Sequence, residues 1–476
     1  MTVWRERRAV ARLYCTLKPT PDIANMNCQL LKQVRVIDPV SKRDQIADIL
    51  VIDGYIKTIE SEINDYPENT IIINSKGLIL GPGLVDLYSQ SGEPGFEERE
   101  NLNSLLNAAA AGGFTRLGIL PNTIPAIDNP ATVTLLQQRS EKVAILNSEF
   151  QRPKLYLWGA LTQDVAGQQM TELSELADTG VVGFADGKPL ENLALLRRIL
   201  EYLKPLNKPL ALYACDRQLA VNGVMREGND SILCGLPGIP QFAETAALAA
   251  ILELVEVTGT PIHIMRVSTA RSVELIAQAK ARNLPITAST TWIHLLLNTT
   301  SINRIWNQPL EDQDSTIIHA IPLPYNPNLR VDPPLGNPSD QQALIQGLET
   351  GIIDAIAIDH TPYCYEEKTV AFADAPPGVI GLELALPLLW ETFVESGRWS
   401  ALDLWGFLSS NPAICLQQTP YSIQPDQPAE MILFDPKTSW VVNTNTLKSR
   451  SINTPWLGQE ITGLVIKTWS HDVSIS

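Results

Sequence analysis

The sequence predicts an α/β protein: a (β/α)8 barrel with a small β-sandwich domain formed by both chain ends. Three observations support this prediction. Strand-like segments gather near both ends of the chain. In the middle of the chain, short apolar strands alternate with helical segments, and there are enough of these strands to form a closed barrel. Strands that are apolar on both faces are typical of a parallel sheet covered by helices. An open doubly wound sheet is the alternative, but neither GxGxxG nor GxxxxGK[ST] occurs, so we favour the barrel.

The β domain is expected from residues 26–80 and 422–476. Two strand-like runs, residues 49–52 and 55–59, are separated by Asp53-Gly54, a pair typical of a two-residue hairpin turn. Further strand-like runs occupy residues 71–73, 78–80, 431–434 and 464–466.

An N-terminal extension, residues 1–25, precedes this domain. It is basic, but it lacks the apolar stretch that a secretory signal needs. It is interpreted either as a transit peptide or as sequence upstream of a start at Met26. We favour the second interpretation, because strand-like patterning begins just after Met26.

The barrel is expected from residues 81–421. Its strands are predicted at residues 84–88, 115–120, 155–160, 181–186, 210–214, 262–267, 286–290 and 355–359. Helices are predicted between them at residues 102–111, 191–203, 244–257 and 272–281. In such barrels the chemistry takes place at the C-terminal ends of the strands, so candidate residues are sought there.

The composition excludes some classes of partner. A formal net charge of -16 leaves no basic footprint for nucleic acid or for an anionic membrane. No apolar run approaches the ~20 residues of a membrane span. The cysteines are scattered without CxxC pairs, which indicates neither a zinc knuckle nor a disulfide framework. We therefore expect a cytoplasmic protein.

Short motifs along the chain resemble those of one enzyme family. Residues 81–90, GPGLVDLYSQ, resemble the first barrel strand of the amidohydrolase superfamily, whose pattern is PG-[FL]-[VI]-D-x-H-x-H. The chain also has counterparts, in order, of LREPGFE (91–97), MPNT (120–123), F-[ST]-D (184–186), HVST (266–269), NPPL (332–335), TDHAPH (358–363) and NTPxxG (453–458). Hydantoinases and allantoinases share the architecture, but EPGFE together with NPPL resembles dihydroorotases.

This resemblance implies a zinc-dependent hydrolase of cyclic amides, in which the metal polarises a carbonyl and supplies hydroxide. The family's ligands come from the HxH pair, a strand-four Asp, a strand-five His, the His of HVST and the Asp of TDHAPH, which is also the general base. In this chain those positions hold, in that order, Tyr88, Gln90, Asp186, Tyr213, Arg266 and Asp359. Phenol and amide groups are poor zinc ligands and a guanidinium repels a cation, so we expect no metal and a vestigial Asp359.

The positions that the resemblance assigns to substrate are also altered. The Arg of LREPG is Gly92, the Asn of NPPL is Asp332, and the final His of TDHAPH is Tyr363. Asn122 of the PNT motif persists. Most of the substrate clamp is therefore replaced along with the metal site.

The histidines of the chain are His263, His294, His319, His360 and His471. By strand alternation His263 points away from the face of Arg266, and it is expected to be a packed core residue. His294 and His360 lie in matching motifs, but not at ligand positions. A relocated metal site that uses them is the less favoured alternative. Asp186 and Asp359 could simply cap loops, but their place in the motifs favours inheritance.

The expected function follows from the resemblance. It implies a dihydroorotase homologue of pyrimidine biosynthesis that has lost its activity. Inactive chains of this kind assemble with aspartate carbamoyltransferase, so we expect a structural or regulatory subunit that is itself a homo-oligomer. The alternatives are an active dihydroorotase or other cyclic-amide hydrolase with a rebuilt site, and a module that binds a small molecule in the emptied barrel mouth.

A final hypothesis concerns the position of the lost metal. Asp186 and Asp359 would face each other there and repel. We expect the guanidinium of Arg266 to supply the missing positive charge and to bond Asp359, Asp186 or both. The hydroxyls of Tyr88 and Tyr213 are expected to join this network.

Overall fold

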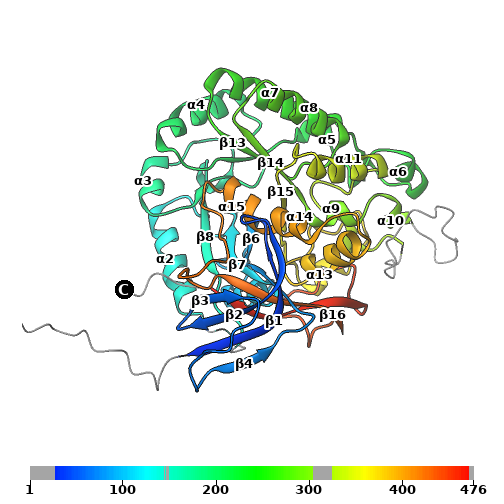
Figure 1. Cartoon of the computed structure of the whole chain (residues 1–476). Helices are drawn as coiled ribbons and strands as arrows, with labels where there is room; N and C mark the ends of the chain where they lie inside the picture. Colours follow the sequence, from blue (N-terminus) through cyan, green and yellow to red (C-terminus); the bar gives the residue numbers. More distant parts are fainter. Residues whose placement is uncertain (1–26, 144, 146–148, 304–323, 471–476) are drawn as a thin grey trace, which may run out of the picture.

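The computed structural model describes residues 27–143, 145, 149–303 and 324–470. The predictions for residues 1–25, His319 and His471 lie outside these residues. Figure 1 shows two parts: a barrel wrapped by helices, and below it a sheet where strands from the start of the chain meet strands from its end.

Eight strands within the described residues form the barrel. They are β6 (Leu84–Ser89), β7 (Phe114–Ile119), β8 (Lys154–Gly159), β9 (Gly183–Phe184), β10 (Ala211–Tyr213), β13 (Ile262–Met265), β14 (Ile286–Thr291) and β15 (Ala355–Ala357). They run as two parallel four-stranded sheets, β6-β7-β8-β9 and β10-β13-β14-β15. All of the predicted strands are confirmed.

The two sheets join at both edges. Phe184 and Leu210 form a parallel bridge between β9 and β10. On the other side, Asp359 N donates to Tyr88 O at 3.1 Å, and Gln90 N donates to His360 O at 2.8 Å. The barrel is therefore closed, and the ends of β6 and β15 are fixed side by side.

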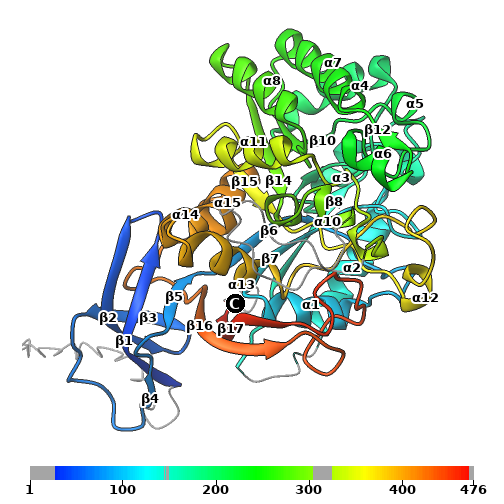
Figure 2. The ribbon, with the colours of Figure 1, turned by 90° about the vertical axis from the view of Figure 1, so that its right-hand side faces the viewer.

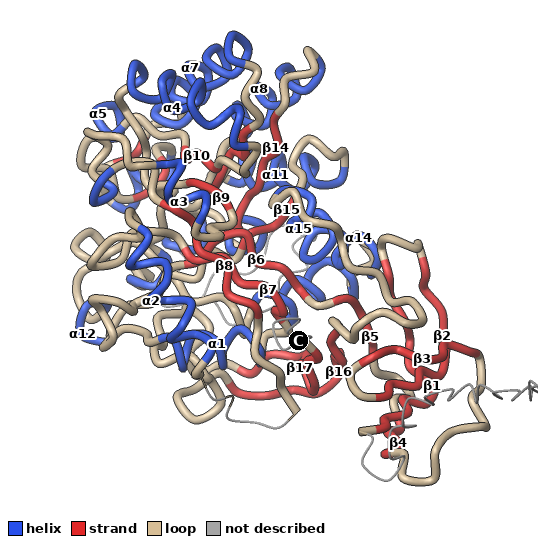
Figure 3. Tube along the Cα trace, turned by 90° about the vertical axis from the view of Figure 1, so that its left-hand side faces the viewer, coloured by secondary structure: helices blue, strands red, loops and turns tan. Residues whose placement is uncertain are grey.

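Helices cover the outer face of the barrel, as Figures 1 and 3 show. The predicted helices correspond to α1 (Leu102–Ala111), α4 (Leu193–Leu203), α7 (Phe242–Thr258) and α8 (Ala270–Ala281), with ends shifted by at most two residues. The other helices of the barrel wall are α2 (Pro130–Glu141), α3 (Leu173–Asp178), α11 (Pro338–Glu349), α13 (Ala385–Leu389), α14 (Ala401–Trp405) and α15 (Asn411–Cys415). π-Helical turns follow α13 at Trp390–Glu395 and α14 at Gly406–Ser410.

Short elements lie in the loops that connect strands to helices. They are α5 (Arg217–Ala220), β11 (Met225–Arg226), α6 (Asn229–Cys234), β12 (Gly238–Ile239), α9 (Trp292–Leu296), α10 (Thr300–Asn303) and α12 (Tyr365–Lys368). Thr269 caps α8 by accepting from Ser272 N, so the residues just before it, including Arg266, leave the end of β13 in a fixed direction. None of the helices in the described part of the chain is long and apolar enough to cross a membrane.

The β domain is one seven-stranded sheet drawn from both ends of the chain, visible at the lower left of Figure 2. Its strands are β1 (Cys28–Asp38), β2 (Arg43–Ile52), β3 (Tyr55–Glu60), β4 (Ile71–Asn74), β5 (Ile79–Pro82), β16 (Met431–Val441) and β17 (Glu460–Trp469). The predicted hairpin joins β2 and β3. Asp53 has φ 50° and Gly54 has φ 76°, the left-handed pair that a type I′ turn requires.

Candidate functional site

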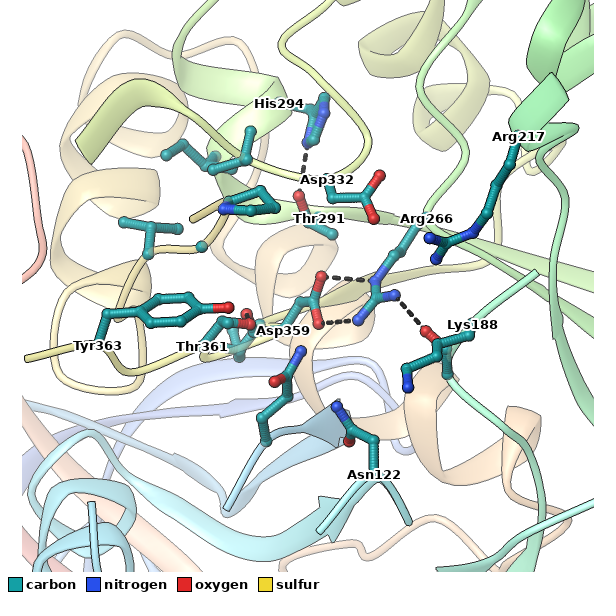
Figure 4. A pocket seen from close by; sticks show the side chains of 18 residues that line it. Asn122, Lys188, Arg217, Arg266, Thr291, His294, Asp332, Asp359, Thr361 and Tyr363 are labelled. Atoms are coloured by element: carbon teal, nitrogen blue, oxygen red, sulfur yellow. Dashed lines mark hydrogen bonds and ion pairs between the residues drawn. The ribbon is translucent and has the colours of Figure 1, made fainter. Parts of the chain in front are cut away.

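A cavity of about 170 Å³ opens at the C-terminal ends of the barrel strands. Figure 4 shows its lining, and ten of the side chains are labelled there. The charged groups come from five different segments of the chain: Lys188 after β9, Arg217 at the start of α5, Arg266 after β13, Asp332, and Asp359 after β15. Neutral polar groups are supplied by Gln90, Asn122, Thr291, His294, Thr361 and Tyr363.

An ion pair between Arg266 and Asp359 forms the floor of this cavity. Arg266 Nε donates to Asp359 Oδ2 at 2.7 Å, and Arg266 Nη2 donates to Oδ1 at 2.6 Å, which is the two-pronged geometry that a guanidinium favours. Arg266 Nη1 also donates to Gly187 O at 2.8 Å. The side chain of Arg266 is 4% exposed and that of Asp359 is 11% exposed, so little water screens the pair. The hypothesis that Arg266 bonds Asp359 is confirmed.

The backbone at both partners is strained. Arg266 has φ 55° and Asp359 has φ 51°, in the left-handed region that residues with a Cβ rarely adopt. Burial on its own would lower the pKa of Arg266, but the charge and hydrogen bonds of Asp359 outweigh it and hold that pKa above its ordinary value. Strained backbone that holds a buried charge pair in place is typical of a functional site.

The hypothesis about the tyrosine hydroxyls is confirmed for Tyr88, whose hydroxyl bonds the backbone of Arg266, and wrong for Tyr213. Tyr88 Oη lies 2.8 Å from Ser289 Oγ and accepts from Arg266 N at 3.0 Å, while Tyr213 Oη donates to Asp332 Oδ1 at 2.6 Å. What the two tyrosines offer the guanidinium is their rings, whose centroids lie 5.7 Å and 5.3 Å from Arg266 Cζ. These distances suit cation–π contacts. Burial raises the pKa of both phenols, so both stay neutral.

Asp186, the other carboxylate that the hypothesis named as an alternative partner, is not bonded to Arg266 within the described residues. Asp186 Oδ1 accepts from Leu161 N at 2.8 Å and Thr162 N at 3.1 Å, and Oδ2 accepts from Thr162 Oγ1 at 2.6 Å. Burial raises the pKa of this carboxyl, and the bonds from Thr162 and Leu161 oppose that rise. Asp186 therefore anchors the loop after β8, and it does not line the cavity.

Most of the positions that the resemblance assigns to substrate line the cavity, and one of them does not. Asn122, Asp332 and Tyr363 line the cavity, and so does Gln90 from the former ligand positions. Gly92 does not, and a Cβ at this position would lie 2.2 Å from Glu100 O, so this backbone has no room for an arginine there. The substrate contact that the resemblance implies for an arginine at position 92 therefore cannot form on this backbone.

The described histidines are held by hydrogen bonds. His263 lies between Thr287 Oγ1 and Ser289 Oγ, and burial lowers its pKa to about 3, as expected for a packed core residue. His294 lines the cavity, and burial lowers its pKa to about 4. As a neutral ring it must donate from Nε2 to Pro333 O at 3.1 Å and accept at Nδ1 from Thr291 Oγ1. His360 Nδ1 accepts from Gly381 N, and its Nε2 lies 3.4 Å from Glu100 Oε2.

Zinc does not fit these residues. Within the described ranges, no group of three or more His, Cys, Asp or Glu side chains is placed to hold a metal ion. Asp359 already binds a guanidinium, Asp186 is turned to Thr162, and the remaining ligand positions carry two tyrosines and an amide. Catalytic zinc sites need at least about three protein ligands.

Sequence reasoning missed two charged residues of the cavity, Lys188 and Arg217. Lys188 lies in the loop after β9 and Arg217 is the first residue of α5. Both stand just beyond the C-terminal ends of predicted strands, where functional side chains gather in this fold. That position was the available signal. Neither residue falls at a ligand or substrate position of the motifs, so the resemblance did not point to them.

Comparisons with known proteins agree with this architecture. A family model described as dihydro-orotase-like matches residues 77–272. The chain is 42% identical over 458 residues to a probable dihydroorotase-like protein of Synechocystis sp., covering 93% of this chain and 99% of the relative. It is 35% identical over 440 residues to a dihydroorotase of Syntrophus aciditrophicus, covering 92% and 97%.

Solved structures share the fold at low sequence identity. L-Hydantoinase (dihydropyrimidinase) from Arthrobacter aurescens superposes with a TM-score of 0.75 at 21% identity, covering 94% of this chain and 97% of that one. Dihydropyrimidinase from Brevibacillus agri superposes with a TM-score of 0.71 at 18% identity, covering 93% and 94%. At such identities the likeness concerns the fold alone.

Proposed function

The chain belongs to the dihydroorotase-like family, and we propose that it is a member without hydrolytic activity that serves pyrimidine biosynthesis as a protein subunit. The observation that supports this proposal is the Arg266–Asp359 ion pair. It occupies the carboxylate that the family's reaction uses as a general base. It also places a fixed cation at a position where the resemblance implies a zinc ligand.

The chemical consequence of this replacement is large. Zinc lowers the pKa of bound water toward 7 and polarises the carbonyl under attack. A guanidinium bonded to Asp359 carries positive charge, but it offers water no vacant coordination position. Asp359, in turn, accepts two bonds from Arg266 and is not free to take a proton from water. Activation by the metal and proton transfer to the general base are therefore lost together.

The barrel itself is intact, which favours a role for the whole fold. The chain spans 99% of a dihydroorotase-like relative, and its barrel is closed at both edges. The resemblance implies assembly with aspartate carbamoyltransferase. We propose this enzyme as the partner, with the chain acting as a cytoplasmic homo-oligomer that supports its assembly or regulation. The cavity also favours a second role, the binding of a small molecule.

Metal content and turnover test the loss of activity. Purified protein, dialysed and then offered zinc, is expected to hold well under about one zinc per chain, because fewer than about three ligands are available. Turnover of dihydroorotate should stay at background, since metal activation is the largest missing contribution. An active dihydroorotase of the family, assayed in parallel, is the control. Stoichiometric zinc together with measurable hydrolysis would overturn the proposal.

Mixing with the transcarbamoylase tests the proposed partner. Combined at micromolar concentration with the aspartate carbamoyltransferase of the same cell, the chain should elute with it as a larger assembly. The size of the chain alone, measured in the same run by light scattering, reports whether it self-associates. If the two proteins elute separately and transcarbamoylase activity and melting temperature are unchanged, this partner is wrong.

A further inference from the structure

Helix α7 is apolar on its outward side as well as on its buried side. A helix on the surface of a barrel ordinarily turns charged and polar side chains to solvent. The buried side of α7 includes Leu248, Ile251 and Val255. At 3.6 residues per turn, the opposite side of the helix carries Phe242, Ala246, Ala249, Ala250, Glu253 and Val257. We call these six residues the outer face of α7, and Glu253 is their only charged member.

The two largest side chains of the outer face are exposed at opposite ends of the helix. Phe242 is 53% exposed and Val257 is 79% exposed. Ala246 between them is exposed as well. Figures 1 and 2 show α7 between α4 and α8, on the side of the barrel far from the β sheet, where no other element of the described chain covers it. An exposed apolar surface of this kind is typical of a protein–protein contact.

The apolar surface continues beside the start of α7. α5 is tied to this helix, because Asp216 N donates to Ala243 O at 2.7 Å. Leu219 of α5 is 37% exposed, and Val221, which follows α5, is 75% exposed. A stable interface needs about 800 Å² from each partner, more than the outer face of one helix provides. The side chains of Leu219 and Val221 widen the available surface at the Phe242 end.

The order of side chains along the outer face is self-complementary. Ala249 and Ala250 lie at its centre, and Phe242 and Val257 lie equally far from that centre on opposite sides. Across a second, antiparallel α7, the alanines of both copies meet at the crossing point, where small side chains let helix axes approach to about 8 Å. Phe242 then packs beside Val257 of the second copy. Such a two-fold contact uses the same face on both copies.

The charges beside the outer face also suit a second copy. A net charge of -16 opposes the approach of two chains wherever unpaired carboxylates dominate the surface. Beside α7 the charges are paired at 2.6–2.9 Å: Arg197 with Glu201 on α4, Arg271 with Glu274 on α8, and Arg282 of the residue following α8 with Glu256 of α7. These pairs neutralise one another, so two copies meet here without strong repulsion. A basic partner would find little to attract it.

We infer that the outer face of α7 is the interface between two copies of this chain, with the two helices antiparallel and crossing at Ala249 and Ala250. In this arrangement Glu253 lies beside Ala246 of the second copy, because these two positions are also equally far from the centre. The inference rests on the proposed function for one point only, that the chain is a homo-oligomer. It adds which surface makes the contact and in which register.

Sedimentation of the full chain over a range of concentrations, alone in solution, tests this inference. The wild type is expected to dimerise at micromolar concentration. Ala246→Glu places a carboxylate beside Glu253 of the second copy, twice in each dimer, and should weaken dimerisation at least about tenfold. The Ala246→Glu/Glu253→Lys variant should dimerise like the wild type, because opposite charges then face each other.

The matched control is Ala131→Glu. Ala131 is an exposed alanine of α2, which lies away from α7 in Figure 1, so this variant adds the same charge and should dimerise like the wild type. All of these variants should be folded by circular dichroism, since the altered alanines are exposed and glutamate and lysine are good helix formers.

The outcomes separate this inference from the proposed function. A monomeric wild type would overturn the interface and the expected homo-oligomer, but not the loss of activity, which zinc content and turnover test. A dimer that Ala246→Glu leaves intact, that Ala131→Glu weakens equally, or that Glu253→Lys does not restore would overturn the interface alone. So would a different protein that binds the wild-type chain and not Ala246→Glu while the dimer persists in both.

Discussion

Replacing Arg266 with methionine is expected to lower the free energy of unfolding by about 3–5 kcal/mol. The substitution keeps an unbranched side chain of similar length, so the left-handed backbone at position 266 is no more strained than before. What it removes is the partner of a carboxylate that is only 11% exposed. It also removes the cation from between the rings of Tyr88 and Tyr213. Urea unfolding followed by circular dichroism measures the change.

A double-mutant cycle separates the ion pair from the packing. Asp359→Asn keeps the shape of the side chain and removes its charge. The Arg266→Met/Asp359→Asn protein should therefore be more stable than Arg266→Met alone. Arg282→Met is a matched control, because Arg282 pairs with Glu256 at 2.6 Å but both side chains are more than two-fifths exposed. It should cost less than about 1 kcal/mol. Equal losses for Arg266→Met and Arg282→Met would contradict a neutralising role for Arg266.

The barrel could be predicted because its strands are local in the sequence. Each is a short apolar run, helical periodicity lies between several of them, and neither pattern depends on a distant contact. The fourth strand was predicted least accurately, because both of its ends were placed too far out. Residues 181–186 were predicted, but β9 covers only Gly183–Phe184. Beyond Phe184 the chain turns, and the carboxylate of Asp186 binds backbone N–H groups at the end of β8.

Part of the candidate site could be predicted from the sequence, because the motifs mark which positions lie at the barrel mouth. The pairing of Arg266 with Asp359 follows from two motif positions known to meet at the barrel mouth. The partners of Tyr88 and Tyr213 do not follow, because Ser289 and Asp332 come from other strands and loops whose side-chain directions the sequence does not give. Lys188 and Arg217 were missed for the same reason, since only the closed barrel brings their loops to one cavity.

The replacements at the metal site support one another. Arg266 neutralises Asp359, Tyr88 and Tyr213 place their rings against the guanidinium, and Tyr88 also accepts from the backbone of Arg266. Removing Arg266 leaves Asp359 without its ionic partner and both rings without the guanidinium. We therefore expect that one reversion alone does not restore a zinc site.

Restoring the ligands stepwise gives the last expected result. Arg266→His alone should bind no stoichiometric zinc and show no hydrolysis, because Asp186 stays bonded to Thr162 and only the new imidazole and Asp359 would be available. A variant with histidine at positions 88, 90, 213 and 266 supplies four imidazoles beside Asp359, enough for a zinc site of at least about three ligands.

The deciding control is the matched variant Tyr88→His/Gln90→His/Tyr213→His, which keeps Arg266. It should bind zinc at least about a hundredfold more weakly than the fourfold variant, because the guanidinium repels the metal and holds Asp359. Zinc is measured by elemental analysis and by competition with a chromophoric chelator, with circular dichroism to show that each variant is folded. Equal zinc affinity in the two variants, or zinc-dependent hydrolysis by Arg266→His alone, would show that Arg266 does not stand in the place of the metal.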